Sequence, residues 1–428
     1  MDKPIVSLHK DTFIRQLWYS GLALMTILGA LLLLSACGNR AGSDTYQAGF
    51  PDCPSDLAGL LTSPIIDMDS LVVLTPLGNS APPGHTFPVD HIYFNDGIHD
   101  SPPTGLYAPG SGTITQIIEE QGFDNSGNVM RSSVAIDIVL CKGVMITLGS
   151  EAVLTPEIRE AINQAGPGQC KDSAGKHENE NSIHTCSYRF HYSVTAGTKL
   201  GDISQGNNPN PEVWAFNYNA TRRTDVDWTR YSNEKFTYTF CLFDLYSGDL
   251  KSEYYSKFGT YIDPAMAIAA YKKGGKPVPP DLVTGFIPRT GEPICGSINQ
   301  NVSGTVQGDW FGAEYEKTFS INSKDLALIH SNSDPTIGRF SIGGNFVPSP
   351  GIDEFIPLHS GTYNREFSEV TADGNVYCYD GTNSTLIWQH QGTKILVQLM
   401  DAHHLKIESQ SGTCGPNEKF VNPFDYDR

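Results

Sequence analysis

The stretch GLYAPGSGTITQI, residues 105–117, gives the strongest indication of the fold class of this chain. Gly110 and Gly112 suit tight turns, and residues 113–117 alternate polar and apolar side chains. This alternation is typical of a β-strand with one buried face. The stretch therefore predicts a turn followed by a half-buried strand.

Similar signals on both sides of this stretch extend the prediction to a domain. Apolar or alternating runs lie at residues 71–74, 134–139, 144–148, 192–203 and 213–218. One helix is expected between them, with Thr155 as its N-cap, Pro156 as its first residue and Gly166 at its end. The 42 Gly and 27 Pro of the chain are a turn-rich composition that suits β-structure. We therefore expect a mainly β fold, with a first β-domain over residues 63–245.

Two motifs of this domain resemble those of the LytM/M23 family of zinc peptidases. The stretch at residues 105–117 resembles the family element written roughly as pVyAp.dGtV, and VTAGTKLGDI, residues 194–203, resembles the later V.aGq.iG.vG turn. Their order and separation match a LytM-type β-domain. The family acts on the peptides of peptidoglycan, so the resemblance implies a ligand or substrate in the cell wall.

The resemblance also implies where a metal would bind. M23 peptidases hold zinc with a His and an Asp from an HxxxD motif and with a His from a later HxH motif. By this resemblance, His85, Asp90 and His91 are the candidate metal ligands, and His184 or His191 would complete the site. Such ligands let zinc polarise a carbonyl group and activate a bound water.

The sequence departs from the family pattern at this site. His85 and Asp90 are five positions apart rather than four, and the chain contains no HxH. Ala215 stands at the position expected for the lost ligand. Because catalytic zinc needs three protein ligands and structural zinc four, we assign no catalytic residue and expect no bound cofactor. The domain is then a non-catalytic M23-like module that binds cell-wall material or a protein partner. The alternative is a zinc-dependent peptidoglycan endopeptidase with an irregular metal site.

The N-terminus has the pattern of a secretory signal. A basic start precedes an apolar run over residues 17–34, which ends in Leu34-Ser35-Ala36-Cys37. This ending resembles the lipobox of bacterial lipoproteins. The resemblance implies that residues 1–36 are removed, that lipid on Cys37 anchors the chain to the bacterial membrane, and that the rest lies outside the cytoplasm. A retained transmembrane anchor is the alternative, because the run approaches spanning length. Residues 37–62 are expected to form a tether.

The chain has nine cysteines, and Cys37 accounts for the odd one. The remaining even set, in an oxidising compartment, predicts up to four disulfides. The sequence does not select one connectivity, but Cys170–Cys186 and Cys378–Cys414 are the preferred local pairs.

A second domain is expected after a junction over residues 246–289, which contains a helix signal at 263–274 and the Pro-rich segment 276–280. Strand signals follow at residues 303–311, 326–330, 337–342, 367–370, 376–379, 385–390, 394–399 and 405–408. Short strands with little helix predict a small antiparallel β-barrel or β-sandwich over residues 290–428. Trp310 is expected in its core, and a small-ligand carrier that uses this barrel is a third functional alternative.

The charge of the chain excludes one class of partner. A net charge of −18, from 29 Lys and Arg against 47 Asp and Glu, opposes binding to a phosphate backbone. We therefore expect no nucleic-acid partner. The expected partners are the membrane, through the lipid on Cys37, and peptidoglycan or an envelope protein.

Overall fold

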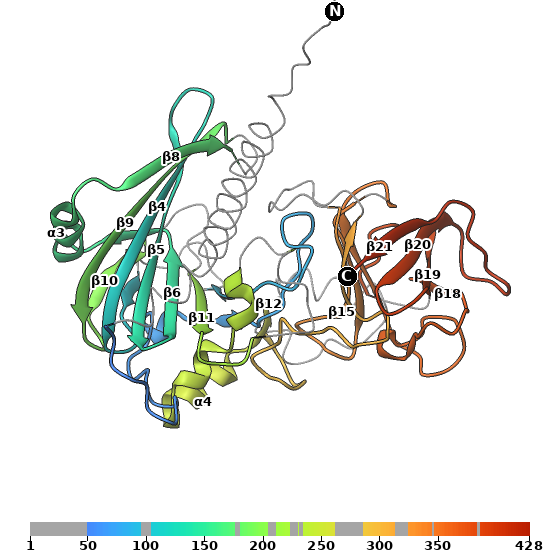
Figure 1. The fold of residues 1–428 in the computed structure, drawn as a ribbon, viewed down its shortest axis with the longest axis horizontal. Helices are drawn as coiled ribbons and strands as arrows, with labels where there is room; N and C mark the ends of the chain where they lie inside the picture. The colour runs from blue at the N-terminus through green and yellow to red at the C-terminus, as the bar shows by residue number, and fades with distance from the viewer. Residues whose placement is uncertain are drawn as a thin grey trace, which may run out of the picture. The chain divides into compact units, whose positions relative to one another are not determined.

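The chain is built mainly from β-strands (Figure 1). The computed structural model describes residues 49–95, 104–175, 180–203, 211–222, 230, 234–261, 286–312, 324–344, 346–382 and 386–428. The expected signal peptide, Cys37, the helix expected at 263–274 and the Pro-rich segment 276–280 lie outside these residues. Residues 52–428 belong to one compact unit. The prediction of a mainly β fold is confirmed.

The first sheet has eight antiparallel strands in the order β1-β2-β11-β6-β5-β4-β9-β8. The strands are β1 (Val73–Thr75), β2 (Ile92–Asn95), β4 (Gly112–Phe123), β5 (Val129–Cys141), β6 (Val144–Ser150), β8 (Gln169–Ala174), β9 (Ser182–Val194) and β11 (Glu212–Asn217). A smaller sheet contains β3 (Thr104–Tyr107), β10 (Lys199–Ile203) and β7 (Ala152–Leu154), in that order. The two motifs at 105–117 and 194–203 meet here, because β10 pairs with β3.

The long hairpin of β4 and β5 supplies much of the first core. Ile114, Ile117, Ile136 and Ile138 are all fully buried. Burial of such side chains contributes roughly 1.5–3 kcal/mol each to folding. The half-buried strand predicted from residues 113–117 is thus present, and it continues to Phe123.

One helix packs against this sheet as the sequence predicted. Helix α3 (Pro156–Ala165) begins after Thr155, whose side-chain oxygen accepts a hydrogen bond from the backbone N–H of Ile158. Gly166 ends the helix with a φ of 89°, a conformation that favours glycine. Ile158 and Ile162 are the buried side chains of its apolar face.

Residues before β1 and after β11 also belong to the first core. After β11 come η3 (Glu234–Tyr238), η4 (Leu242–Leu245), α4 (Gly248–Ser256), β12 (Gly259–Tyr261) and β13 (Phe286–Pro288). Tyr254 and Phe258 are buried in the same cluster as the sheet residues. Upstream, the backbone N–H groups of Gly59 and Leu61 donate to the carbonyl of Leu245. The last part of the expected tether is therefore packed against this core.

The second sheet also has eight antiparallel strands, in the order β17-β16-β15-β14-β21-β20-β19-β18. The strands are β14 (Gly308–Gly312), β15 (Leu326–His330), β16 (Gly338–Ile342), β17 (Gly351–Phe355), β18 (Tyr377–Asp380), β19 (Thr393–Leu399), β20 (His404–Ser411) and β21 (Phe424–Asp427). A bridge between Asp353 of β17 and Trp388, which lies between β18 and β19, nearly closes the sheet into a barrel. The sequence predicted a small antiparallel β-barrel or β-sandwich, and the structure has the barrel-like form.

Two strand predictions in this part are wrong. Residues 367–369 form a 3-10 helix, η6 (Phe367–Glu369), because the side chain of Glu366 caps its N-terminus. The described part of the strand expected at 385–390 makes one isolated bridge, at Trp388, and forms no strand.

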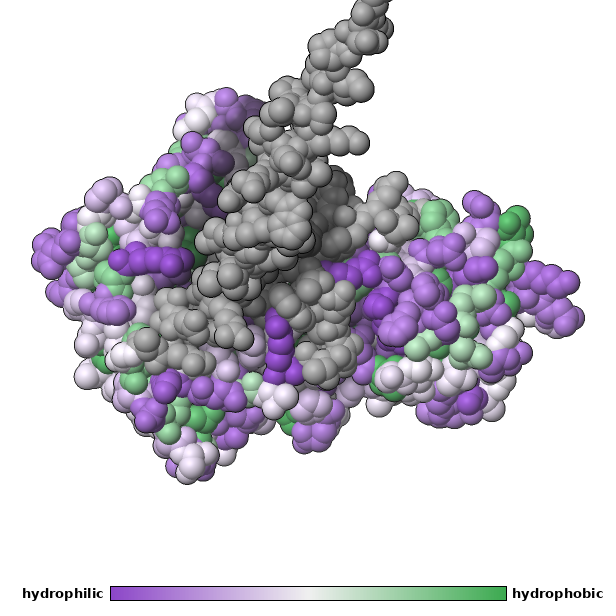
Figure 2. Space-filling view, in the orientation of Figure 1, coloured by the Kyte–Doolittle hydropathy of each residue, from purple (hydrophilic) through white to green (hydrophobic). Residues whose placement is uncertain are grey.

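The segment between β1 and β2 contacts the second sheet. The side-chain amide of Asn332 donates to the carbonyl of Pro76 at 3.1 Å. Arg339 of β16 donates to the hydroxyl of Ser80 at 3.2 Å. His85 lies in this same segment, which is therefore held by contacts with both the first and the second sheet. On the face shown in Figure 2, hydrophobic residues lie in small groups among hydrophilic ones.

Candidate functional site

The three predicted metal ligands lie together at the start of β2. The Nδ1 atom of His91 is 3.1 Å from a carboxylate oxygen of Asp90, and its Nε2 atom is 2.6 Å from the hydroxyl of Tyr93. The same hydroxyl is 3.3 Å from Nε2 of His85. The structure therefore places His85, Asp90 and His91 in one hydrogen-bonded group, with Tyr93 between the two histidines.

Strand β11 covers this group with an indole. The Nε1–H of Trp214 donates to Asp90 at 3.0 Å, and its ring centroid lies 4.7 Å from that of His91. Side chains alternate across a strand, so Ala215 points the other way and is buried in the core. Trp214, rather than Ala215, occupies the position that faces the candidate ligands. The expectation for Ala215 is wrong because it ignored this alternation.

Burial shifts the pKa values of three groups in this cluster toward their uncharged forms. Desolvation, together with the neighbouring His91, lowers the pKa of His85 to about 4. Desolvation also raises the pKa of Tyr93 and of Glu212. At neutral pH, His85 is therefore a neutral imidazole and Tyr93 is a neutral phenol. Hydrogen bonds through the hydroxyl of Tyr93 link the two histidines of this group.

The arrangement of these atoms does not fit a zinc ion. Zinc bonded to both imidazoles would lie about 2.0–2.1 Å from each Nε2 atom. The hydroxyl of Tyr93 lies between those two atoms, and Asp90 faces the opposite nitrogen of His91. The three residues thus lack a common point toward which their lone pairs converge. No catalytic step can be derived through a metal here.

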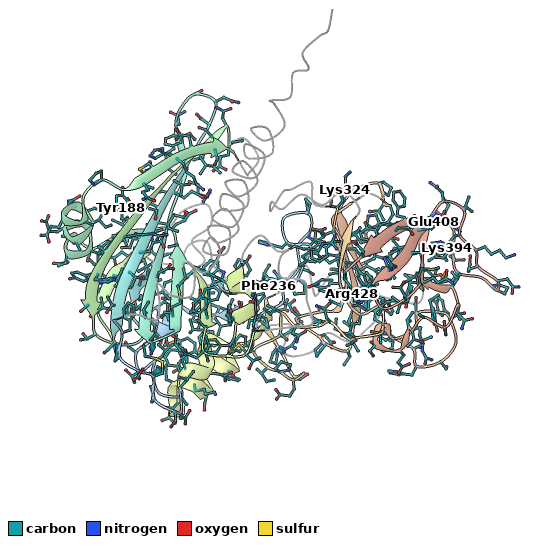
Figure 3. The ribbon with its side chains drawn as sticks, viewed as in Figure 1. Tyr188, Phe236, Lys324, Lys394, Glu408 and Arg428 are labelled. Atoms are coloured by element: carbon teal, nitrogen blue, oxygen red, sulfur yellow. A yellow bond between two sulfur atoms is a disulfide. The ribbon has the colours of Figure 1, made fainter. Side chains whose placement is uncertain are left out.

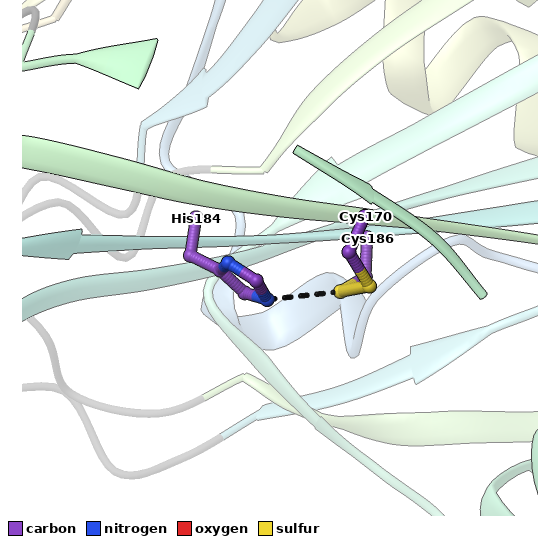
Figure 4. A group of neighbouring side chains, drawn as sticks. All are labelled: Cys170, His184 and Cys186. Carbon is purple, nitrogen blue, oxygen red and sulfur yellow. Dashed lines mark hydrogen bonds between the residues drawn. A yellow bond between two sulfur atoms is a disulfide. The ribbon is translucent and has the colours of Figure 1, made fainter. Parts of the chain in front are cut away.

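His184 belongs to another group. It lies on β9, five strand positions from β2 in the first sheet, which is roughly 24 Å along the sheet at about 4.8 Å per strand. Its Nε2 atom is 3.1 Å from the sulfur of Cys186 (Figure 4). Among the described residues, Cys170, His184 and Cys186 are the three that bring ligand-type atoms within 4.8 Å of one another. The two sulfurs are bonded to each other, so neither is a thiolate that could bind a metal.

Four disulfides use all the cysteines of the described residues. The pairs are Cys53–Cys141, Cys170–Cys186, Cys241–Cys295 and Cys378–Cys414. Both predicted pairs are confirmed. Cys37, the ninth cysteine, lies outside the described residues.

The barrel interior is filled by aromatic side chains. Trp310, Phe340, Phe355, Phe367 and Tyr379 are all fully buried in one cluster. The indole of Trp310 donates to a backbone carbonyl at 2.8 Å, which confirms its predicted place in the core. The guanidinium of the C-terminal Arg428, labelled in Figure 3, lies over the same indole, 4.2 Å from the ring centroid. This packing counts against a small-ligand carrier that uses the barrel interior.

Comparison with protein-family models, curated proteins and solved structures finds no match to this chain. The likeness of residues 63–245 to LytM/M23 peptidases therefore rests on the two sequence motifs and stays a prediction. Within the described ranges, none of the helices has the length and apolar character needed to cross a membrane.

Proposed function

We propose that this chain is an exported, lipid-anchored protein of the bacterial cell envelope, and that its first β-domain is a non-catalytic M23-like binding module. Export is supported by the complete pairing of the eight described cysteines, because disulfides persist in oxidising compartments. Anchoring is supported by the Leu34-Ser35-Ala36-Cys37 sequence.

The non-catalytic part of the proposal rests on one observation. The hydroxyl of Tyr93 occupies the Nε2 atoms of both histidines, and the indole of Trp214 donates to the carboxylate of Asp90. Buried polar groups that are hydrogen-bonded to one another are typical structural features. We expect no resident zinc and no peptidase activity.

The proposed ligand is cell-wall material or a protein partner of the envelope. The resemblance to a family that acts on peptidoglycan peptides favours the wall. The net charge of −18 disfavours anionic polymers such as nucleic acids.

The metal content of the purified protein tests the non-catalytic proposal. We expect less than stoichiometric zinc by elemental analysis, and no release of muropeptides from sacculi. Stoichiometric zinc that is lost in His85→Gln and Asp90→Asn would overturn the proposal. Muropeptide release that a chelator stops would establish the endopeptidase alternative instead.

Two further assays test the anchor and the ligand separately. Cys37→Ser should abolish incorporation of radiolabelled palmitate and move the protein out of the membrane fraction. The detergent-solubilised protein should sediment with insoluble peptidoglycan, and chymotryptic digestion of envelope proteins before the assay should not change this. Sedimentation that requires those proteins would indicate a protein partner.

A further inference from the structure

The edge hairpin of β8 and β9 brings four reactive side chains onto one face of the first sheet. Cys170 lies directly opposite Cys186, and Asp172 lies directly opposite His184. Residues two apart on a strand share a face. The two cross-strand pairs are therefore neighbours, and they form a compact group that the proposed function does not use.

Hydrogen bonds link Asp172, His184 and Cys186 in that order. A carboxylate oxygen of Asp172 lies 2.7 Å from Nδ1 of His184. On the other side of the ring, Nε2 of His184 lies 3.1 Å from the sulfur of Cys186 (Figure 4). A protonated imidazole carries an N–H on both nitrogens. With Asp172 holding one of them, the other is directed at the sulfur. His184 is thus placed to give a proton to Cys186 when the disulfide breaks.

Accessibility distinguishes the two sulfur-bearing residues. Every residue of β8 is exposed, including Cys170, because this strand is the edge of the sheet. Cys186 is only 7% exposed. Of the eight described cysteines, Cys170 is the one that is exposed; the others are buried or half-buried. A reagent from solution therefore meets Cys170 first, while Cys186 remains beside His184.

We propose that Cys170–Cys186 is a thiol-exchange site, whose partner is the thiolate of a small thiol or of a dithiol protein. The incoming thiolate sulfur attacks the sulfur of Cys170 and forms a new disulfide with it. The bonding pair of the old disulfide passes to the sulfur of Cys186, which takes a proton from Nε2 of His184. The partner is oxidised and Cys186 is reduced, so no further oxidant or reductant is needed. This proposal does not depend on the lipid anchor or on wall binding.

The competing explanation is a purely structural disulfide that holds an exposed edge strand in place. It makes no prediction about which sulfur reacts, or about His184. The proposal predicts both, because leaving-group protonation and access to the attacked sulfur determine the rate and the site of exchange.

The test treats the folded, full-length protein in detergent with reduced glutathione, in the presence of EDTA, and traps free thiols by alkylation. Peptide mass spectrometry then assigns each cysteine. We expect glutathione on Cys170 and the alkyl group on Cys186, before any of the other three disulfides reacts. His184→Gln should slow this exchange ~10-fold or more, and Asp172→Asn should slow it less.

His191→Gln is the matched control, since it removes another histidine of β9 and should leave the exchange rate unchanged. The other three disulfides should react as in the wild type, which shows that each variant is folded. If Cys170 reacts with glutathione but not with a thioredoxin-class dithiol protein, the partner is a small thiol. If it reacts with the dithiol protein but not with glutathione, the partner is a protein. The proposal is overturned if another disulfide exchanges first, if Cys186 carries the label, if neither thiol reacts, or if His184→Gln reacts at the wild-type rate.

Discussion

A buried ion pair stabilises the closure of the C-terminal barrel. Asp353 of β17 accepts hydrogen bonds from the backbone N–H of His390 at 3.1 Å and from its Nδ1 atom at 2.6 Å. The two side chains are 0% and 5% exposed. Because His390 lies just before β19, the pair connects two segments that the strand order places at opposite ends of the sheet. Its removal should therefore open the barrel at the point where it is nearly closed.

We expect Asp353→Asn to destabilise the protein by about 3–5 kcal/mol, the usual cost of removing one partner from a buried ion pair. The substitution keeps the size and one acceptor oxygen of the side chain. The lost free energy of unfolding therefore reports the negative charge of Asp353. The hydrogen bond that the His390 ring donates to the Asp353 carboxylate raises the pKa of His390. The stabilisation from protonated His390 is therefore fully present below its unfolded pKa of about 6.5, and it is lost as the pH rises through the raised value. The cost of the substitution should be larger at low pH than at high pH.

Urea unfolding, followed by tryptophan fluorescence at pH ~6 and ~9, measures this cost. The matched control is Asp401→Asn, since Asp401 pairs with His404 at 2.8 Å but the two side chains are 58% and 65% exposed. Exposed pairs contribute little to stability, so the control should unfold close to the wild type. Our reasoning would be refuted if Asp353→Asn lost no more stability than Asp401→Asn, or lost more at high pH than at low pH.

Three further predictions concern the candidate site and the C-terminal barrel. The pKa of His85 is lowered to about 4 in the folded protein, so between pH 6.5 and 4 its side chain is protonated mainly in the unfolded chain, which favours unfolding by up to about 3 kcal/mol. His85→Gln should therefore lose less stability than the wild type over this pH range. Urea midpoints that fall with pH as in the wild type would contradict this. Replacing Cys378 and Cys414 by Ala should cost about 4 kcal/mol, as expected for a loop with a sequence separation of 36, and calorimetry measures the loss. Trp310→Ala should cost about 3–5 kcal/mol by cavity formation, whereas Val421→Ala, at a side chain that is 83% exposed, should leave the urea midpoint unchanged.

The strands that the sequence predicted are those with an apolar face or an apolar run. β15 has the predicted bounds, and β6 and β19 differ from prediction by one or two residues, because their buried side chains form a clear pattern. β8 was missed, since its six residues are all exposed and show no alternation of apolar and polar side chains. No strand was predicted there, although pairing with β9 and the Cys170–Cys186 disulfide hold these residues in the sheet. Propensity and periodicity cannot report an edge strand that buries nothing.

The candidate site was predicted in its location and only partly in its composition. The family motif led to His85, Asp90 and His91, which the structure gathers. It did not lead to Tyr93 or Trp214, which satisfy them. Tyr93 could have been found if residues 91–94 had been recognised as a strand, because it lies two residues after His91 and then shares its face. Trp214 comes from a strand far along the chain, and only the pairing of β2 with β11 brings it to Asp90.

The disulfides also determine how the chain stays connected after a cut in its backbone. Among the pairs formed by described residues, three join cysteines at or before Cys295 and one joins Cys378 to Cys414, so none spans the segment between Cys295 and Cys378. One proteolytic cleavage in this segment would leave two fragments held together only by packing, which separate on a non-reducing gel. A cleavage between Cys241 and Cys295 would leave one covalent molecule until reductant is added. The two β-parts can therefore be parted by a single protease, each with its own disulfides intact.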